Sequence, residues 1–194
     1  MTLIIQPPSG GKLTLHQPQY PASPAAGEEW TDPSTGTVWV YDNGNWILSY
    51  NNWSFTIDTE AVTPGVTTFS IITNNPAACY CEIDWGDGQK QPLTIGTGVV
   101  TTTHTYAAAG TYEISIRDTS GAFRPYYNNN AEAAKITALG PPWLGYSFGT
   151  NLERAWFGGS NITAIAAGMD TSSVTNFLNS WRSCSSLTSF PLID

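Results

Sequence analysis

Apolar and polar positions alternate most clearly between residues 79 and 116. Every second residue from Cys79 to Trp85 is apolar, which is the period-two pattern of a β-strand with one buried face. Residues 110 to 116 repeat this pattern, and we expect Tyr112, Ile114 and Ile116 to face inward. Two strands that each bury one face predict a β-sandwich.

A tight turn is predicted where the first of these strands ends, in the run Asp84-Trp85-Gly86-Asp87-Gly88. Its glycines permit positive φ, and its aspartates can accept hydrogen bonds from backbone amides two residues further on. The chain is therefore expected to reverse here and to form a hairpin. Trp85 and the later Tyr106 are predicted to lie in the core.

The C-terminal third of the chain has a longer period. Residues 136–139, 162–165 and 187–190 share the order apolar, threonine, small, apolar, and recur about every 25 residues. Two sets of apolar or small residues precede the later copies with the i, i+4, i+7 spacing of one helical face. These sets are Leu152, Trp156 and Gly159, and Phe177, Trp181 and Cys184. The pattern predicts a solenoid whose repeats each contain a short helix and a short strand.

The N-terminal region has a different composition. Residues 1 to 27 are rich in proline and glycine, and their only apolar run is Leu3, Ile4 and Ile5. This composition predicts an extended arm, which is either a disordered tail or an arm fixed by a neighbouring chain.

An aromatic β-hairpin is predicted for residues 28 to 50, because two aromatic-rich strands flank an Asn-Gly turn signal. An isolated hairpin is only marginally stable. We therefore expect Trp30, Trp39 and Trp46 to pack on each other or on another subunit. The same rings could instead form a platform for stacking carbohydrate.

The composition favours a mainly β protein, because eight Trp and nine Tyr accompany many glycines while only 11% of residues are charged. Fifteen acidic and seven basic residues give a net charge of -8, which argues against a nucleic-acid partner. No apolar run is long enough to span a membrane and no standard signal peptide is present, so membrane insertion is not expected.

The residue types give no convergent acid, base and nucleophile, so we expect neither catalytic residues nor a cofactor. Of the three cysteines, Cys79 and Cys81 are too close on one strand for an unstrained disulfide, and free thiols are expected. Cys184 has no histidine in its module to activate it. No metal site is predicted, although Asp84 and Asp87 leave calcium open if backbone carbonyls assist.

The central region resembles the PKD domain (polycystic kidney disease type), an immunoglobulin-like β-sandwich. That family's signature is D-[FW]-G-D-G followed by H-x-Y and G-x-Y-x-V. Here the first part is Asp84 to Gly88, the second contains His104 and Tyr106, and the third contains Tyr112. The resemblance covers residues 52 to 118 and implies a spacer or ligand-presenting module. Residues 119 to 130 are expected to be a linker loop.

Residues 131 to 194 resemble the leucine-rich repeats of bacterial surface proteins that are called BspA-like. This resemblance implies surface adhesion and makes Trp181 and Cys184 core positions. A repeat array needs a cap over its last hydrophobic face, and none is encoded. We therefore expect further repeats in the natural chain or a second subunit over this end.

The tryptophan pattern of residues 30 to 46 resembles a short module of bacteriophage structural and tail-fibre proteins, especially those of marine and cyanobacterial phages. The three modules together predict a virion-surface protein, namely a tail fibre, head fibre or capsid decoration protein. The residues expected to attach it to the particle are Leu3, Ile4, Ile5, Trp30, Trp39 and Trp46.

The expected partners are other virion proteins and a host receptor or glycan. A homo-oligomer is expected, and a trimer if the protein is a fibre. The alternative is a bacterial cell-surface adhesin or a non-catalytic binding module of a secreted protein.

Overall fold

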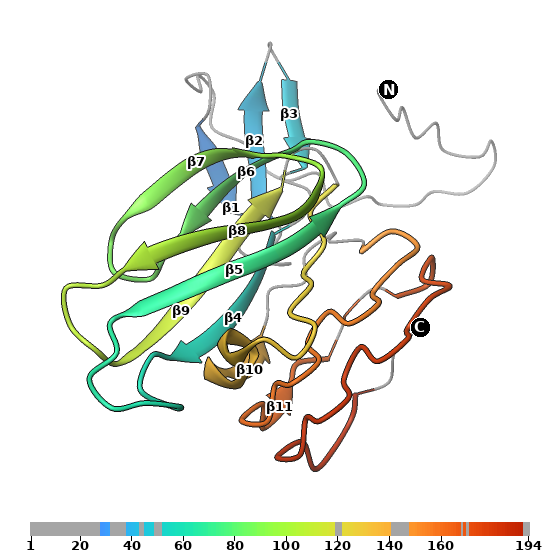
Figure 1. Ribbon diagram of the computed structural model, residues 1–194. Helices are drawn as coiled ribbons and strands as arrows, with labels where there is room; N and C mark the ends of the chain where they lie inside the picture. The colour runs from blue at the N-terminus through green and yellow to red at the C-terminus, as the bar shows by residue number, and fades with distance from the viewer. Residues whose placement is uncertain are drawn as a thin grey trace. The chain divides into compact units, whose positions relative to one another are not determined.

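The fold was analysed in a computed structural model, which describes residues 28–31, 38–42, 45–48, 52–118, 122–140, 148–167, 169 and 171–191. The chain divides into two compact units, Met1–Ile47 and Leu48–Asp194. Within the described ranges the protein is mainly β, with one short 3-10 helix and no α-helix (Figure 1). The predicted fold class is therefore confirmed at this level. The predicted arm, with Leu3, Ile4 and Ile5, lies outside the described residues.

A three-stranded sheet forms the described part of the first unit. Its strands are β1 (Glu29–Thr31), β2 (Val38–Asp42) and β3 (Asn45–Leu48), in the order β1-β2-β3. The neighbouring β2 and β3 correspond to the predicted hairpin, and β1 adds a third strand. In the antiparallel register of β1 and β2, Trp30 lies opposite Trp39.

The second unit contains a six-stranded sheet in the order β11-β10-β4-β9-β6-β7 and a two-stranded sheet of β5 and β8. The pairing is antiparallel except for β10 with β11, which is parallel. The strands are β4 (Asn52–Asp58), β5 (Thr68–Asn75), β6 (Cys79–Asp84), β7 (Lys90–Ile95), β8 (Gly98–Thr105), β9 (Thr111–Asp118), β10 (Ile136–Gly140) and β11 (Ala164–Ile165). In Figure 1, β5 and β8 lie across the face of the larger sheet.

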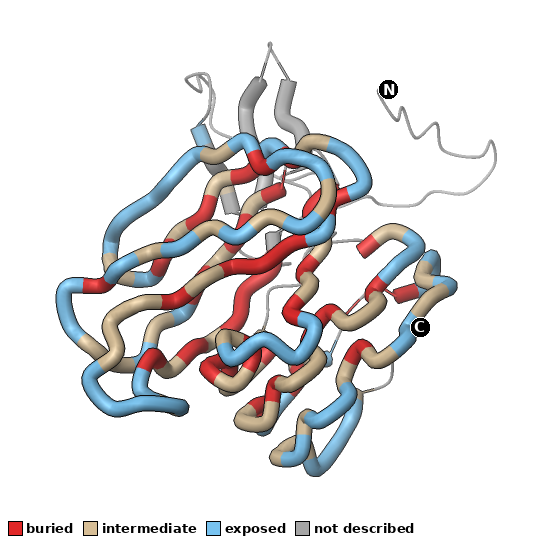
Figure 2. The backbone as a smooth tube through the Cα atoms, in the orientation of Figure 1, coloured by how far each residue is buried: buried red, intermediate tan, exposed pale blue. Residues whose placement is uncertain are grey.

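Alternating side chains build the core between these sheets, as the sequence predicts. Cys79, Cys81 and Ile83 of β6 are buried, whereas Tyr80 is 58% exposed. Figure 2 shows buried and exposed positions along the strands, and in β8 half-buried residues alternate with exposed ones. Phe55 of β4 meets Phe69 of β5 with ring centroids 5.9 Å apart, which joins the two layers. Each such buried side chain stabilises the fold by about 1.5–3 kcal/mol.

The structure describes residues 122 to 130 of the segment predicted as a linker loop, and Ala122, Phe123 and Tyr127 are part of this core whereas residues 128–130 are exposed. The Tyr126 amide donates to the Ile72 carbonyl at 2.8 Å, and the Asn74 amide donates to the Arg124 carbonyl at 2.9 Å. The neighbouring Phe123 is buried. This segment therefore follows the free edge of β5 and satisfies backbone groups that an open edge would leave unpaired.

A short 3-10 helix, η1 (Ala131–Lys135), connects this segment to β10. Its buried Lys135 lies 2.7 Å from the Glu132 carboxylate and donates to the Thr68 carbonyl at 2.9 Å. The second oxygen of Glu132 accepts from the Ser70 amide at 2.7 Å. The ion pair thus fixes η1 to β5 with its donors and acceptors satisfied, as a buried charge requires.

The predicted helices of the repeats do not form, and this prediction was wrong. Residues 153–158 and 178–183 are successive turns. Arg154 and Asn179 have φ of 56° and 58°, and Ser183 has φ of 65°. Left-handed backbone at these positions interrupts a right-handed helix. The side chains wrongly placed on helices are Leu152, Trp156 and Gly159, and Phe177, Trp181 and Cys184.

The repeat copies instead stack through hydrogen bonds from one copy to the next. Four amides of the second copy donate to carbonyls of the third at 2.9 to 3.0 Å. The donors are Leu152, Arg154, Trp156 and Gly158, and the acceptors are Asn176, Leu178, Ser180 and Arg182. The second copy also supplies the two-residue strand β11, which pairs with β10 of the first. The equivalent residues of the third copy, 187–190, are not in a strand.

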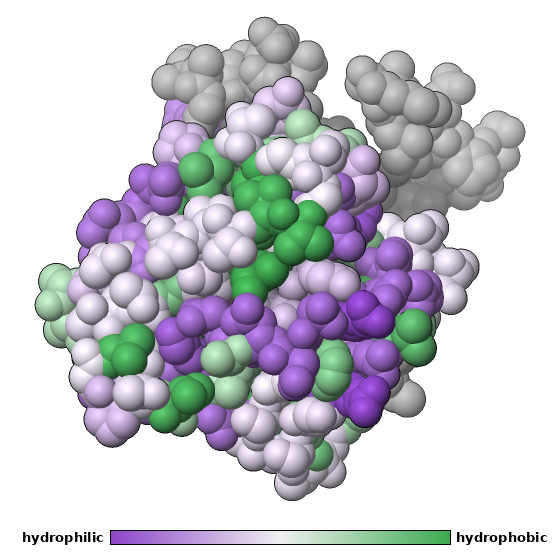
Figure 3. Space-filling view, viewed as in Figure 1, coloured by the Kyte–Doolittle hydropathy of each residue, from purple (hydrophilic) through white to green (hydrophobic). Residues whose placement is uncertain are grey.

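The surface of the described residues carries few large hydrophobic side chains. Those that are exposed are Val62, Tyr80, Val99, Phe177, Leu178 and Phe190. In Figure 3, polar and weakly polar residues cover most of the visible face, and the hydrophobic atoms form separate patches. This distribution is that of a protein whose apolar residues are largely enclosed.

Candidate functional site

The turn between β6 and β7 has the hydrogen bonds that its sequence predicts. Asp84 Oδ1 accepts from the Gly86 amide and Asp87 Oδ1 accepts from the Gln89 amide, both at 3.0 Å. Gly86 and Gly88 have φ of 79° and 85°. The Trp85 amide donates to the Gln89 carbonyl at 3.0 Å. The predicted hairpin is confirmed, and each aspartate caps one part of it.

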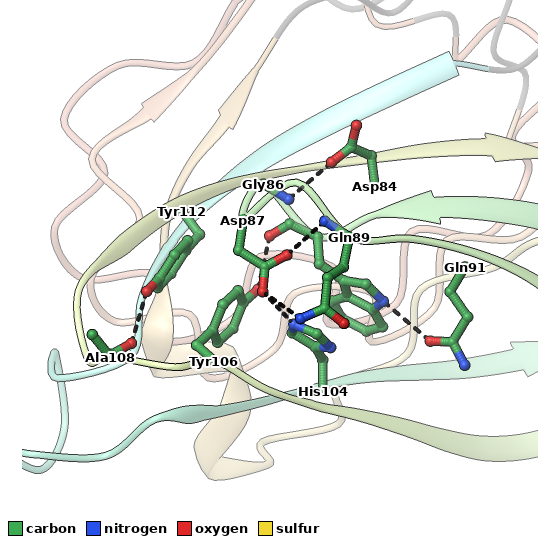
Figure 4. Close-up of polar contacts among 10 residues, drawn as sticks. Asp84, Gly86, Asp87, Gln89, Gln91, His104, Tyr106, Ala108 and Tyr112 are labelled. Atoms are coloured by element: carbon green, nitrogen blue, oxygen red, sulfur yellow. Dashed lines mark hydrogen bonds and ion pairs between the residues drawn. The ribbon is translucent and has the colours of Figure 1, made fainter.

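An aromatic cluster joins this turn to the end of β8 (Figure 4). His104 Nε2 lies 2.8 Å from Asp87 Oδ2, and the imidazole stacks on Trp85 with centroids 4.7 Å apart. The Tyr106 hydroxyl donates to the Trp85 carbonyl at 3.1 Å, and its ring stacks on Tyr112 at 3.8 Å. Trp85 and Tyr106 are buried, as predicted. The signature residues are therefore brought together, in an arrangement that locks the hairpin to β8.

The electrostatics of the cluster follow from these contacts. Partial burial alone would raise the pKa of Asp87, but the hydrogen bonds from His104 and from the Gln89 amide outweigh it and hold that pKa below its ordinary value. Burial raises the pKa of Tyr106, and the charge of Asp87 raises it further. Asp87 is therefore an anion and Tyr106 a neutral phenol at neutral pH, as their hydrogen bonds require.

Substituting Asp87 with asparagine is expected to lower the free energy of unfolding by about 1–2 kcal/mol at neutral pH, because the charge-assisted contact with His104 is lost. Since the pKa of Asp87 is depressed in the folded protein, its stabilising effect is present above the unfolded value of about 4 and is lost as pH falls through the folded value. Urea unfolding between pH 7 and pH 2 should show the difference between wild type and D87N shrinking below about pH 4.

The matched control for this experiment is Asp84→Asn. An asparagine oxygen can keep the bond from the Gly86 amide, and Asp84 does not contact His104. Its effect is expected to be about 0.5 kcal/mol or less, as for most surface substitutions. A difference between wild type and D87N that stayed constant down to pH 2 would contradict the role given to the His104 contact.

The carboxylate oxygens of Asp84 and Asp87 already have hydrogen-bond or ion-pair partners within the protein, and these are the oxygens that a calcium ion at the turn would need. Asp84 Oδ2 lies 3.5 Å from Lys90 Nζ, and both oxygens of Asp87 accept hydrogen bonds or contact His104. Across the described ranges, no group of three or more His, Cys, Asp or Glu side chains is placed to hold a metal ion. The two aspartates thus act on the hairpin itself.

The three cysteines are free thiols, in agreement with the sequence-based expectation. Cys79 and Cys81 are buried in β6. Cys184 is half-buried, and its Sγ donates to the Trp156 carbonyl at 3.5 Å. Burial raises the pKa of the Cys184 thiol to about 11, although a backbone hydrogen bond from Gly159 acts in the opposite direction. The thiol is therefore protonated at neutral pH and packs within the repeat stack.

Trp156 and Trp181 stack on each other at a centroid distance of 5.3 Å, and Trp156 is fully buried.

The structure describes the predicted attachment residues less completely. Trp30 lies in β1 and is half-buried, while the side chains of Trp39 in β2 and Trp46 in β3 lie outside the described residues. The structure therefore assembles the turn cluster and the repeat core, and it leaves the proposed attachment residues as a prediction.

A polar cavity of about 320 Å³ is the feature that sequence reasoning missed. It is formed by the end of β5, residues 124–126 and residues 150–153. These segments are far apart in the sequence, so no local pattern marks them as neighbours. The nearest signal was a few polar residues in each segment, namely Asn74 and Asn75, Arg124, and Asn151 with Glu153, and such residues are typical of any loop.

Comparisons of the chain with protein-family models, with curated proteins and with solved structures give no significant match. In the part of the chain that the structure describes, no helix has the length and apolar character needed to cross a membrane.

Proposed function

We propose that this chain is a structural protein of a bacteriophage particle: a tail fibre, a head fibre or a capsid decoration protein. Its N-terminal residues attach it to other virion proteins, and residues 48–194 are presented outward for contact with the host surface. The observation that carries this proposal is the continuity of the second unit. β10 of the first repeat copy pairs with β4 of the large sheet, and Phe55 and Trp156 belong to one hydrophobic core.

A continuous core of this kind suits a rigid presenting module. The sheets and the repeat copies cannot move independently without breaking the β4–β10 ladder, so a ligand site on either part would be held at a fixed distance from the other. A virion protein needs this mechanical property more than a reaction centre, because weak contacts repeated over symmetric copies give strong overall attachment. We propose a homo-oligomer on this ground, and a trimer if the protein forms a fibre.

We further propose that the two sheets form a PKD-like, immunoglobulin-like sandwich. Supporting this are the contacts among the three signature parts, since Asp87, His104 and Tyr112 all belong to the one cluster at the turn. The stacked copies are proposed to be a variant of BspA-like leucine-rich repeats in which turns replace the expected helices. Their backbone bonds between copies support a solenoid.

Removal of residues 1–47 is expected to abolish incorporation of the protein into phage particles while leaving the second unit folded, because the boundary between the compact units falls at Ile47. Incorporation would be measured by mass spectrometry of purified particles, and folding by thermal unfolding. Normal incorporation of the truncated chain would refute the attachment role. Absence of the full-length protein from particles, with recovery at a bacterial surface, would favour an adhesin instead.

A further inference from the structure

The polar cavity of about 320 Å³ lies wholly within the second unit. Its volume falls at the lower end of the range of about 300–1,000 Å³ that is typical of small-molecule sites. Six of the residues that line it matter for its chemistry: Asn74, Asn75, Arg124, Tyr126, Asn151 and Glu153. It combines amide, guanidinium, carboxylate and phenol groups in one concave surface.

The walls of this cavity are fixed by hydrogen bonds that do not involve a ligand. Asn75 is only 2% exposed, and its Oδ1 accepts from the Arg124 amide at 2.9 Å. The backbones of Asn74 and Arg124 are bonded to each other as well. Elsewhere in the lining, Asn151 Oδ1 accepts from the Glu153 amide at 2.8 Å. A site with walls held in this way loses little conformational freedom on binding.

Arg124 is half-buried as a residue, and its guanidinium donates from Nη1 to the Phe123 carbonyl at 2.7 Å. Among the described residues, no carboxylate forms an ion pair with it. The guanidinium lies close to Gly149, where an added Cβ would meet Arg124 Nη2. In a chain of net charge -8, a partly desolvated cation without an acidic partner attracts an anionic ligand.

The other charges around the cavity are paired with each other. Arg154 Nε lies 3.4 Å from Glu153 Oε1, and Arg154 Nη1 donates to the Tyr126 hydroxyl at 3.2 Å. The second oxygen of Glu153 accepts from Asn176 Nδ2 at 3.4 Å. The negative charge of Glu153 is thus offset locally, which leaves Arg124 as the cation available to a ligand in the cavity.

We infer that this cavity binds a saccharide that carries a carboxylate, such as a terminal uronic acid. A guanidinium binds a carboxylate through two parallel hydrogen bonds. The amides of Asn74 and Asn151 can donate to and accept from sugar hydroxyls, and the ring of Tyr126 offers an apolar face to the sugar ring. The inference rests on the proposed function, since it names the host-surface chemistry that the presented unit would recognise.

Titration calorimetry of the full chain would test this with an oligosaccharide that ends in glucuronic acid and with the same oligosaccharide ending in glucose. We expect the acidic probe to bind and the neutral probe to bind at least about tenfold more weakly, since a charged hydrogen-bonded pair is lost. Arg124→Gln should weaken binding of the acidic probe by at least about tenfold as well. Equal binding of both probes, or binding of neither, would overturn the inference.

Two further variants keep the test sharp if the Arg124 substitution disturbs folding. Asn74 is exposed, so Asn74→Asp adds a negative charge at the rim with little structural effect and should lower the affinity for the acidic probe. Glu153→Gln removes a negative charge and should raise the affinity for the acidic probe. The matched control is Lys90→Gln, which removes a positive charge at the start of β7, where Lys90 pairs with Asp84. Equal weakening by R124Q and K90Q would show general charge attraction and overturn the site.

The outcomes separate this inference from the proposed function. Binding of the acidic saccharide by a protein that is absent from phage particles would leave the site intact and remove the virion role. A protein that is present in phage particles but does not bind the acidic saccharide would keep the virion role and remove the site. An acidic peptide that bound as tightly as the saccharide and was equally sensitive to R124Q would overturn the saccharide class.

Discussion

Replacing Gly86 with alanine is expected to lower the free energy of unfolding of the second unit by about 4 kcal/mol or more, whereas the same change at Gly88 should cost only about 1–2 kcal/mol. Both glycines have positive φ, of 79° and 85°, so both substitutions carry the strain of left-handed backbone. They differ in what a Cβ would meet. At Gly86 it would collide with the carbonyl of Glu113 in β9, and at Gly88 nothing lies within 4 Å.

The larger cost at Gly86 arises because the obstacle is backbone. A flexible side chain could move aside, but Glu113 lies within the seven-residue register that pairs β9 with β4, so relief requires a shift of a central strand. Chemical denaturation of wild type, G86A and G88A would measure both effects. If the two variants were equally stable, the close approach of the turn to β9 would not be a determinant of the fold.

This pair of glycines also shows what the sequence could and could not predict. The need for positive φ at Gly86 and Gly88 follows from local turn chemistry, and the alternation from Cys79 to Trp85 follows from the burial of one strand face. Both depend on residues that are neighbours in the sequence. The approach of Gly86 to Glu113 depends on the pairing of distant strands, so no local pattern contains it.

The helices predicted for the repeat region were wrong for a different reason. The spacing of Leu152, Trp156 and Gly159 fits one face of a helix, but it equally fits three turns that each point a residue into the core. The deciding factor is where the amides donate. A helix would satisfy the Trp156 amide internally, whereas here it donates to Ser180 in the next copy. That choice requires the next copy to be in place, so a single copy read alone predicts the wrong element.

The missed features share this dependence on distant contacts. Lys135 and Glu132 are three residues apart, and their spacing is typical of an exposed helical ion pair. They are instead partly or fully covered, and both bond to the backbone of β5. Arg124 falls within residues 119 to 130, which were expected to be a linker loop. Its position in a cavity results from the packing of that segment along β5.

Replacing Trp156 with alanine is the second change with a large expected effect, a loss of about 3–5 kcal/mol in the free energy of unfolding. Trp156 is 0% exposed. Its ring stacks on Trp181 at 5.3 Å and meets Phe148 edge-on at 5.7 Å. The substitution would leave a cavity between two copies whose backbones are bonded to each other, so the surroundings can collapse only by breaking those bonds. Leu178→Ala, at a position 56% exposed, is the control and should cost about 0.5 kcal/mol or less.

The way in which W156A unfolds tests the continuity on which the proposed function rests. Because Trp156 shares one core with Phe55 of β4, the loss should appear in both parts of the unit. Hydrogen exchange should then show the β4–β9 amides losing protection together with the amides that join the second and third copies. If the repeat copies opened in W156A while β4 and β9 kept their full protection, the two parts would be separate folding units. A repeat stack that opens by itself could not hold a host-binding site at a fixed distance from the sheets, so that result would remove the structural argument for a rigid presenting module.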